Sequence, residues 1–316
     1  MKFENPTSRF IVRSNPQPRL PMNRRTAKEF PQELLDLYDY YVHGQVDRRG
    51  FMERAAKFAV GGLTAAALLE MLSPVYAFAA QVPADDKRVT SSYLKYQSPA
   101  GSGEMRGLFA KPASASGKLP GVLVVHENRG LNPYIEDVVR RVALAGFVAF
   151  GPDALHPVGG YPGNDDEGRA LQAKLDKNKI TEDFVAGVRF LHDHPDCNGS
   201  LGVTGFCFGG GMANTLAWRL ADIVKAAVPY YGGQATEHAA QIKGALLLHY
   251  AELDTRVNAG WPDYEKALKA AGVEYTAYIY PGVNHGFHND TTPRYDQAAA
   301  ELSWQRTIEF FKKKLG

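Results

Sequence analysis

The chain has 316 residues, of which 45% are hydrophobic and 22% are charged, and its formal net charge is +2. These values are near the averages for globular proteins, so they exclude collagen-like, disordered and disulfide-scaffold classes. The positive charge is concentrated in residues 1–28, which contain seven basic side chains and one acidic side chain. The remainder is close to neutral, which argues against a nucleic-acid partner. The two cysteines, Cys197 and Cys207, allow at most one intramolecular disulfide.

Residues 1–80 are predicted to form an amino-terminal arm that precedes the main domain. Residues 1–25 are rich in Pro, Asn, Ser and Arg, which is typical of a loosely held segment. The following segment, residues 30–42, is predicted to be a short amphipathic helix because its apolar side chains recur at helical spacing. These side chains are Leu34, Leu35, Leu37, Tyr38 and Tyr41.

An arginine pair, Arg48 and Arg49, precedes a weakly polar run that ends in the small-residue sequence Ala77-Phe-Ala79. This pattern resembles a twin-arginine export signal, which predicts a periplasmic protein. The alternative is a cytoplasmic protein in which residues 55–72 form a retained helix packed on the main domain. Glu70 and the many Gly, Ala and Thr residues of the run argue against a stable membrane span.

Residues 81–316 are predicted to form one α/β domain with an open, mostly parallel, doubly wound sheet and helices on both faces. Short apolar runs alternate here with amphipathic stretches, as in βαβ units. The runs are nearly continuous in apolar residues, as expected for strands that are covered on both faces. The predicted strands are 121–125, 147–150, 201–204, 226–230, 245–249 and 275–280, with an edge hairpin at 91–97 and 105–110. The predicted helices are 134–145, 181–193, 210–220, 260–271 and 295–314.

The sequence Gly205-Phe-Cys207-Phe-Gly209 lies between a predicted strand and a predicted helix. It matches the G-x-S-x-G nucleophile elbow, with cysteine in place of serine. The turn forces the central residue into a strained conformation, so its neighbours must lack side chains. The positive end of the following helix would favour the thiolate. Cys207 is therefore the candidate nucleophile, and the alternative is a buried cysteine in a glycine-rich turn.

Two further reactive residues follow the elbow, in the chain order that α/β-hydrolases use for their acid and base. Asp254 comes just after one predicted strand, and His285 comes just after the next. Because the carboxyl ends of parallel strands meet at one edge of a sheet, these side chains are expected to lie near Cys207. The open alternatives are Glu252 for the acid, and His249 or His288 for the base.

These motifs together resemble the dienelactone hydrolase family, which is the cysteine branch of the α/β-hydrolase fold. The resemblance is carried by Gly205–Gly211, by the Asp254 loop and by Asn284-His-Gly-Phe287. It extends to Val125-His-Glu-Asn-Arg-Gly-Leu-Asn132 and to Gly151-Pro-Asp-Ala-Leu155, and it spans residue 90 to the end. It implies hydrolysis of an ester or lactone by a Cys-His-Asp triad through an acyl-thioester, without a metal or an organic cofactor.

The resemblance also implies roles for residues outside the triad. Glu127 would contact the resting cysteine and swing away when substrate enters. A salt bridge of Glu127 with Arg129 or Arg140 is the alternative. The oxyanion hole would be formed by the backbone N–H groups of Phe208 and Asn128.

Substrate recognition is the least defined part of the site. The family holds a substrate carboxylate with two arginines, and Arg169 is a candidate for the first of them. The second position is occupied here by Asn289, although Arg294 lies nearby in the sequence, and Tyr161 could line the pocket. The expected partner is a small ester or lactone, and the protein is expected to be a monomer or a homodimer. A catalytically idle protein of the same fold, which binds a ligand or partner, is the competing hypothesis.

Overall fold

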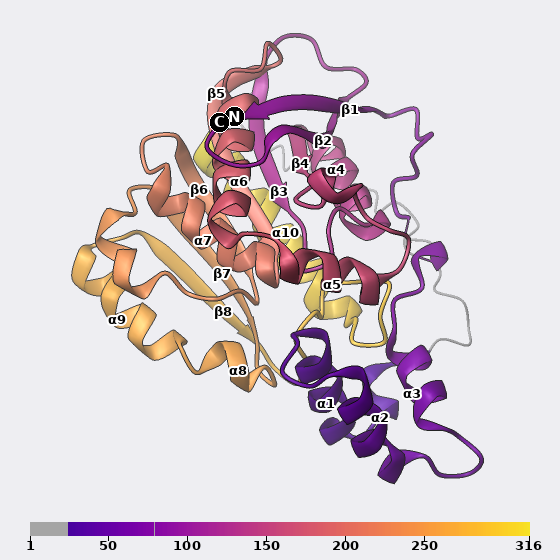
Figure 1. Ribbon diagram of the computed structural model, residues 1–316. Coiled ribbons are helices and arrows are strands. Elements are labelled where there is room, and N and C mark those ends of the chain that lie inside the picture. Colours follow the sequence, from indigo (N-terminus) through magenta and orange to yellow (C-terminus); the bar gives the residue numbers. More distant parts are fainter. Residues whose placement is uncertain (1–24, 79) are drawn as a thin grey trace, which may run out of the picture.

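An eight-stranded sheet lies at the centre of the described part of the chain, residues 25–78 and 80–316 of this computed structural model (Figure 1). The strands are β1 (Val89–Ser98), β2 (Gly103–Pro112), β3 (Leu119–Val125), β4 (Val148–Pro152), β5 (Cys197–Phe206), β6 (Val224–Tyr230), β7 (Ala245–Ala251) and β8 (Tyr275–Tyr280). Their order across the sheet is β1-β2-β4-β3-β5-β6-β7-β8. β2 is antiparallel to both β1 and β4, whereas the other neighbours are parallel. The predicted edge hairpin and mostly parallel sheet are confirmed.

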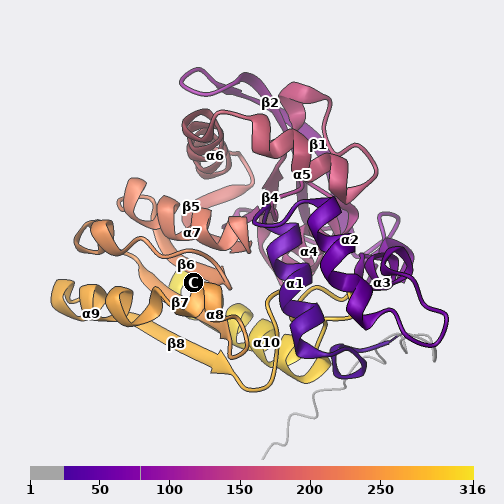
Figure 2. The same ribbon diagram turned by 60° about the horizontal axis from the view of Figure 1, so that its bottom comes forward.

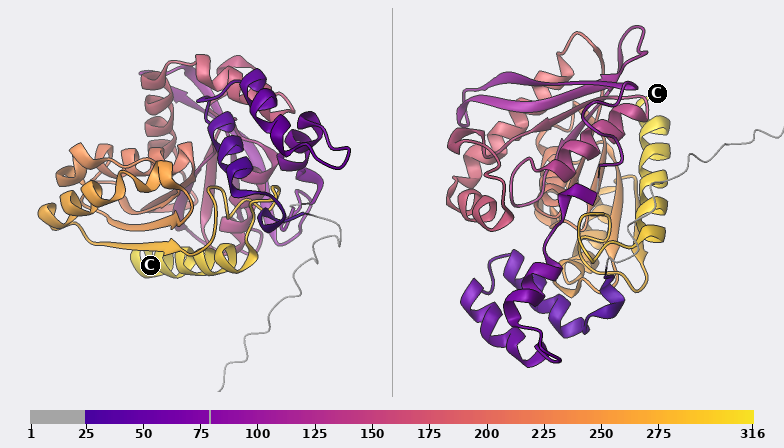
Figure 3. Two further views of the ribbon diagram at one scale, coloured as in Figure 1. Left: turned by 90° about the horizontal axis from the view of Figure 1, so that it is seen from below. Right: turned by 90° about the vertical axis from the view of Figure 1, so that its right-hand side faces the viewer.

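Helices cover both faces of this sheet, as predicted (Figure 3). One face is covered by α4 (Pro133–Leu144) and α10 (Gln297–Leu315), and the other by α6 (Lys177–His192), α7 (Phe208–Arg219) and α9 (Trp261–Ala271). Each face has its own apolar cluster, and alternate residues of β3 supply the two clusters in turn. Because both faces are buried, the parallel strands are nearly continuous apolar runs.

Two helices of the main domain were not predicted, namely α5 (Asp165–Lys174) and α8 (Thr255–Asn258). α5 buries only Gly168 and Gln172, so it has no apolar stripe that a periodicity search could detect. α8 is a single turn whose first backbone groups are capped by the Asp254 carboxylate. Both helices lie at the edge of the sheet where the carboxyl ends of the parallel strands meet.

The amino-terminal segment is a helical unit with an apolar cluster of its own. It contains the predicted helix, α1 (Gln32–Val42), and two further helices, α2 (Arg48–Ala55) and α3 (Ala65–Leu72). The expectation of one continuous helix over residues 55–72 is wrong. Gly61 and Gly62 have positive φ angles of 63° and 86° and turn the chain between the two helices.

The arginine pair Arg48-Arg49 forms the first turn of α2, whose amino end is capped by the carboxylate of Asp47. The predicted loose arm lies outside the described residues except for Arg25, and so does Ala79 of the expected cleavage sequence. Across the described ranges, no helix is both long and apolar enough to cross a bilayer.

The three amino-terminal helices lie against the carboxyl-terminal edge of the parallel strands, with α1 nearest the sheet (Figure 2). Helices of this length are marginal in isolation. Their stability must therefore come from packing, both within the cluster around Leu34, Tyr38 and Phe51 and against the main domain. Tyr38 and Phe51 meet edge to face, with ring centroids 6.5 Å apart.

We expect Leu34→Ala to loosen this helical unit selectively. Leu34 is fully buried, so truncation should cost about 3 kcal/mol of local stability. Hydrogen exchange measured by mass spectrometry should show faster exchange in α1–α3, with exchange in β3 and β5 unchanged. Val60→Ala is the control because Val60 is 69% exposed. Equal acceleration across the whole chain would contradict a separately packed unit.

Candidate active site

Cys207 occupies the sharp turn between β5 and α7, as the elbow motif predicts. Its φ and ψ are 58° and −114°, a strained conformation for a residue with a side chain. A Cβ on Gly205 would collide with the carbonyl of Gly209, and one on Gly209 would collide with the carbonyl of Val125. Glycine is therefore required on both sides, and the sulfur lies at the positive end of α7.

His285 and Asp254 form a buried hydrogen-bonded pair beside this turn. Nδ1 of His285 lies 2.6 Å from Oδ2 of Asp254. Burial alone would raise the pKa of Asp254, but the positive charge and hydrogen bond of His285 outweigh burial and hold the pKa below its ordinary value. A ring nitrogen of His285 lies within 4.8 Å of the Cys207 sulfur. The structure thus brings together the three residues that were predicted to form the triad.

A second histidine, which the sequence analysis did not single out, contacts the sulfur directly. Nε2 of His43, at the end of α1, lies 3.0 Å from Sγ of Cys207. Its Nδ1 lies 2.7 Å from the backbone oxygen of Asp39, one helical turn earlier, and 3.3 Å from the Asp39 carboxylate. The ring of His43 meets that of His285 edge to face, with centroids 4.7 Å apart. The available signal was the Asp39–His43 spacing, which is common on helices and points to no particular site.

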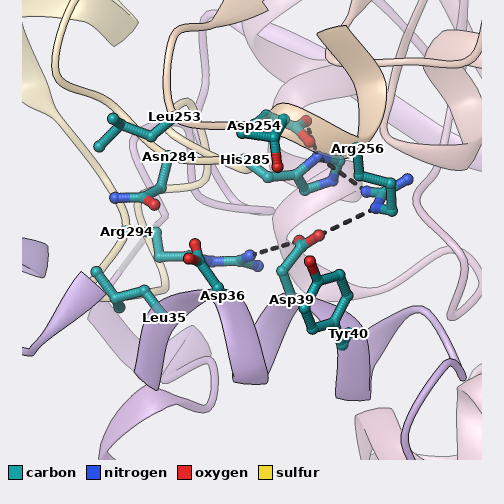
Figure 4. A pocket seen from close by; sticks show the side chains of 11 residues that line it. Leu35, Asp36, Asp39, Tyr40, Leu253, Asp254, Arg256, Asn284, His285 and Arg294 are labelled. Carbon is teal, nitrogen blue, oxygen red and sulfur yellow. Dashed lines mark hydrogen bonds and ion pairs between the residues drawn. The ribbon is translucent and has the colours of Figure 1, made fainter. Parts of the chain in front are cut away.

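Asp39 connects α1 to two arginines of the main domain (Figure 4). Its carboxylate accepts hydrogen bonds from Nε of Arg256 and from a guanidinium nitrogen of Arg294, each at 3.1 Å. Burial would raise the pKa of Asp39, but the charges of His285, His43 and Arg294 hold that pKa well below its ordinary value. Asp39 is therefore a fixed negative charge between four cationic or protonatable groups.

Two groups of side chains have a spacing that metal ions could use. His43, Cys207 and His285 form one, and Asp39, Asp254 and His285 form the other. A guanidinium nitrogen of Arg256 lies 3.1 Å from Nε2 of His43 and 3.3 Å from Nδ1 of His285. A fixed cation therefore already lies against both imidazoles, which disfavours a second cation at this position.

Glu127 is buried and held by two hydrogen bonds. Its Oε2 accepts from Arg129 at 2.7 Å and from Asn289 at 3.1 Å. Arg129 is itself bonded to Asp165 at 2.8 Å. Glu127 was expected either to contact the resting cysteine or to form a salt bridge, and in this conformation it forms the salt bridge with Arg129. The side chain that is hydrogen bonded to the sulfur is that of His43. Arg140, the other suggested partner of Glu127, instead donates to the backbone oxygen of Val82.

A cavity of about 590 Å³ adjoins the residue that follows Cys207. Its wall includes Asn128 and Phe208, whose backbone N–H groups were predicted to form the oxyanion hole, and also His43. Phe208 is the first residue of α7, so the helix itself does not use its N–H. The Asn128 side chain donates to the backbone oxygen of Val42 at 2.7 Å, which ties the early loop to α1. The amino-terminal unit therefore supplies part of the cavity wall.

The four residues suggested for substrate binding have different environments. Arg169 lines the cavity, pairs with Asp166 and lies over the Tyr41 ring at 5.2 Å. Arg294 is directed to Asp39, and Asn289 to Glu127. Tyr161 donates to Asp165 at 2.9 Å. Arg169 is thus the member of this set whose side chain borders the cavity.

The alternative acid and bases have other partners. Glu252 is exposed and accepts from the backbone N–H of Gly282. His249 is buried between Thr307 and Tyr280, at 3.1 Å and 2.9 Å. His288 is also buried and pairs with Tyr134 at 2.7 Å. Burial lowers the pKa of His249 to about 3 and places that of His288 well below its ordinary value, so both imidazoles are neutral.

A cysteine on a strand-to-helix turn, followed along the chain by an acid and a histidine at one sheet edge, defines an α/β-hydrolase type of site. A model of the dienelactone hydrolase family matches residues 105–315, and a second model, described as YqhI-like, matches residues 22–57. The chain therefore belongs to the dienelactone hydrolase family, as the motifs indicated, and family membership indicates a hydrolase. The YqhI-like match ends within the helical unit that carries His43.

Individual relatives agree with this assignment. "Putative hydrolase fragment YghX" of Escherichia coli (strain K12) is 60% identical over 114 residues, which cover 36% of this chain and 97% of that protein. "Protein usf" of Aquifex pyrophilus is 35% identical over 67% of this chain and 94% of its own length. The crystal structure titled "Putative Dienelactone Hydrolase" from Klebsiella pneumoniae superposes with a TM-score of 0.63 at 25% identity, covering 71% of this chain and 99% of that one.

We expect the buried neutral histidines to make stability fall on mild acidification. The unfolded state takes up a proton near the ordinary histidine pKa of 6.5, whereas folded His249 stays neutral down to about pH 3. The contribution of His249 to the free energy of unfolding therefore decreases as the pH falls below 6.5, by about 2 kcal/mol between about pH 7 and about pH 5. Urea unfolding at several pH values should show a shallower loss for His249→Gln than for the native protein. An identical pH dependence for the two proteins would contradict a buried neutral His249.

Proposed function

We propose that the protein hydrolyses a carboxylic ester or lactone, with Cys207 as nucleophile, His285 as acid and base, and Asp254 as the residue that orients His285. The observation that carries this proposal is the position of Cys207, on a strained turn, beside a buried His285–Asp254 pair and directly before Phe208, which lines a cavity. Strain at a buried cysteine is costly, and such strain is concentrated at functional sites.

Acylation begins with attack by the Cys207 thiolate on the substrate carbonyl carbon. A carbon–sulfur bond forms and the carbonyl π electrons move to oxygen, where the N–H groups of Phe208 and Asn128 stabilise the charge. The intermediate then collapses and the carbon–oxygen bond to the leaving group breaks. Protonated His285 transfers its proton to the leaving alkoxide, which leaves an acyl-thioester and a neutral imidazole.

Deacylation reverses the roles of His285. The neutral imidazole takes a proton from water as the hydroxide adds to the thioester carbonyl. The carbon–sulfur bond breaks, the carboxylic acid is released and the thiolate is regenerated. His285 is again protonated, so one water molecule is consumed and both groups return to their starting states. Asp254 stabilises the imidazolium before acylation and after deacylation.

The cavity favours a substrate of moderate size with an apolar acyl or alcohol part. Ile180, Met212 and the ring of Phe208 supply apolar surface, and Arg169 supplies a cation at the wall. A dienelactone would need two arginines to bind its carboxylate. Of the two candidates, Arg169 lines the cavity, whereas Arg294 is directed to Asp39. Esters and lactones without a second carboxylate are therefore the substrates to test first.

We expect Cys207→Ala to abolish hydrolysis of p-nitrophenyl acetate, with a loss of at least about 10³-fold in kcat/KM, because the substitution removes the proposed nucleophile. Cys207→Ser should retain weak activity at best, because the site holds a thiolate and not an alcohol. Cys197→Ala is the matched control, since Cys197 is also buried but lies at the start of β5.

Iodoacetamide labelling mapped by peptide mass spectrometry separates an enzyme from an idle binding protein. An enzyme should lose turnover in proportion to the labelling of Cys207. A native protein that labels at Cys207 yet shows no turnover across a panel of lactones and short-chain esters would favour the idle alternative. Full activity of Cys207→Ala would overturn the nucleophile assignment.

A further inference from the structure

We propose that His43 is a catalytic residue, an imidazolium that the amino-terminal helical unit supplies to hold Cys207 as a thiolate. The proposal rests on the 3.0 Å separation of Nε2 of His43 from the sulfur. It deepens the proposed function and depends on it only for the effect on turnover. The pairing of His43 with the sulfur stands or fails independently of the substrate.

The orientation of the His43 ring is fixed from its other nitrogen. Nδ1 lies 2.7 Å from the backbone oxygen of Asp39, an acceptor only, so this nitrogen carries a proton. The proton shared between Nε2 and Sγ then decides the charge state. With that proton on nitrogen, the pair is an imidazolium and a thiolate joined by a charge-assisted hydrogen bond.

Charges of both signs surround His43, and their balance favours the ionised pair. Burial and the charge of His285 lower the pKa of His43, but the negative charge of Cys207 and the hydrogen bond that the ring donates to Asp39 outweigh them and raise the pKa above its ordinary value. Asp39 on the same helix is the nearest carboxylate. The groups that face the ring from the main domain are Cys207 in the elbow, Arg256 in α8, and His285 with Asp254 at the ends of β8 and β7.

His43 and His285 would have different roles in catalysis. The buried Nε2 of His285 has no hydrogen-bond partner among the described residues, so it is available to exchange a proton with the leaving group or with water. His43 already holds the sulfur, and it keeps its proton throughout. It stabilises the thiolate in the free enzyme, and it stabilises the same thiolate as the leaving group of deacylation.

His43 lines a cavity as well as contacting the sulfur, so we assign it to the wall of the site. The cavity of about 590 Å³ is present with α1 in place, and His43, Asn128 and Phe208 share its wall. The cavity adjoins the elbow through His43 and Phe208, and we infer that a carbonyl group reaches the sulfur and the proposed oxyanion donors from this side. The amino-terminal unit completes the wall of the site and does not fill it.

The test compares His43→Gln with the native protein and with His192→Gln, in the full chain and with a chelator present. His192 is the matched control because it lies at the partly exposed carboxyl end of α6 and, within the described ranges, its side chain pairs with its neighbour Asp193. We expect alkylation of Cys207 by iodoacetamide near pH 6 to slow by at least about 10-fold in His43→Gln, and its pH profile to move to higher pH. His192→Gln should match the native protein in both respects.

Rescue with a small molecule distinguishes a chemical role of the His43 imidazole from a purely structural one. In His43→Ala, added imidazole should restore alkylation and, if the proposed function holds, kcat, because the free base can enter the adjoining cavity. Thermal unfolding shows whether each variant is folded, and His43→Asn replaces any variant that is not.

Unchanged alkylation of a folded His43→Gln would overturn the proposal, and so would faster ester hydrolysis by His43→Ala, which would identify a plug. Slowed alkylation in a protein that hydrolyses none of the esters would leave the His43–Cys207 pair standing and would count against the proposed function.

Discussion

The hydrogen bond between His43 and Cys207 is the contact on which the arrangement of the whole site depends. It joins a helical unit at the start of the chain to the nucleophile elbow of the main domain, over a sequence separation of 164 residues. The surrounding contacts position it: Asp39 spans from α1 to Arg256 and Arg294, and Asn128 binds the carbonyl that precedes His43. Without the helical unit, the sulfur would lose its hydrogen-bond partner and the cavity would lose one wall.

This dependence bears on the fate of the amino-terminal segment. Cleavage after Ala79, as a twin-arginine signal would require, would remove α1 and with it His43. The arginine pair is also part of a folded element here, since Arg48 pairs with Asp166 of the main domain at 2.7 Å. Farther along, Val75 donates to Thr291 and Tyr76 to Asp165. These contacts hold the described part of the amino-terminal segment against the main domain.

Much of the main domain could be predicted from sequence because its signals are local. The strands are apolar runs, and the elbow needs glycine on both sides of Cys207. Asp254 and His285 each follow a predicted parallel strand, so their positions in the chain were enough to predict that they lie at the same edge of the sheet as Cys207. The role of His43 could not be predicted, because it depends on how one short helix docks against a distant turn. Glu127 illustrates the same limit: its motif is local, but its partner here, Arg129, is fixed by a network that includes Asp165 and Asn289.

The charge state of His43 is the most direct test of this account. Nitrogen-15 NMR of histidine-labelled protein, with the His43 signal assigned from His43→Gln, reports the protonation of both ring nitrogens as pH is raised. The account predicts that His43 remains an imidazolium above the ordinary histidine pKa of about 6.5, and that it becomes neutral at lower pH when Cys207 is replaced by serine. A His43 that is neutral at about pH 7 in the native protein, with a titration unchanged by Cys207→Ser, would contradict it.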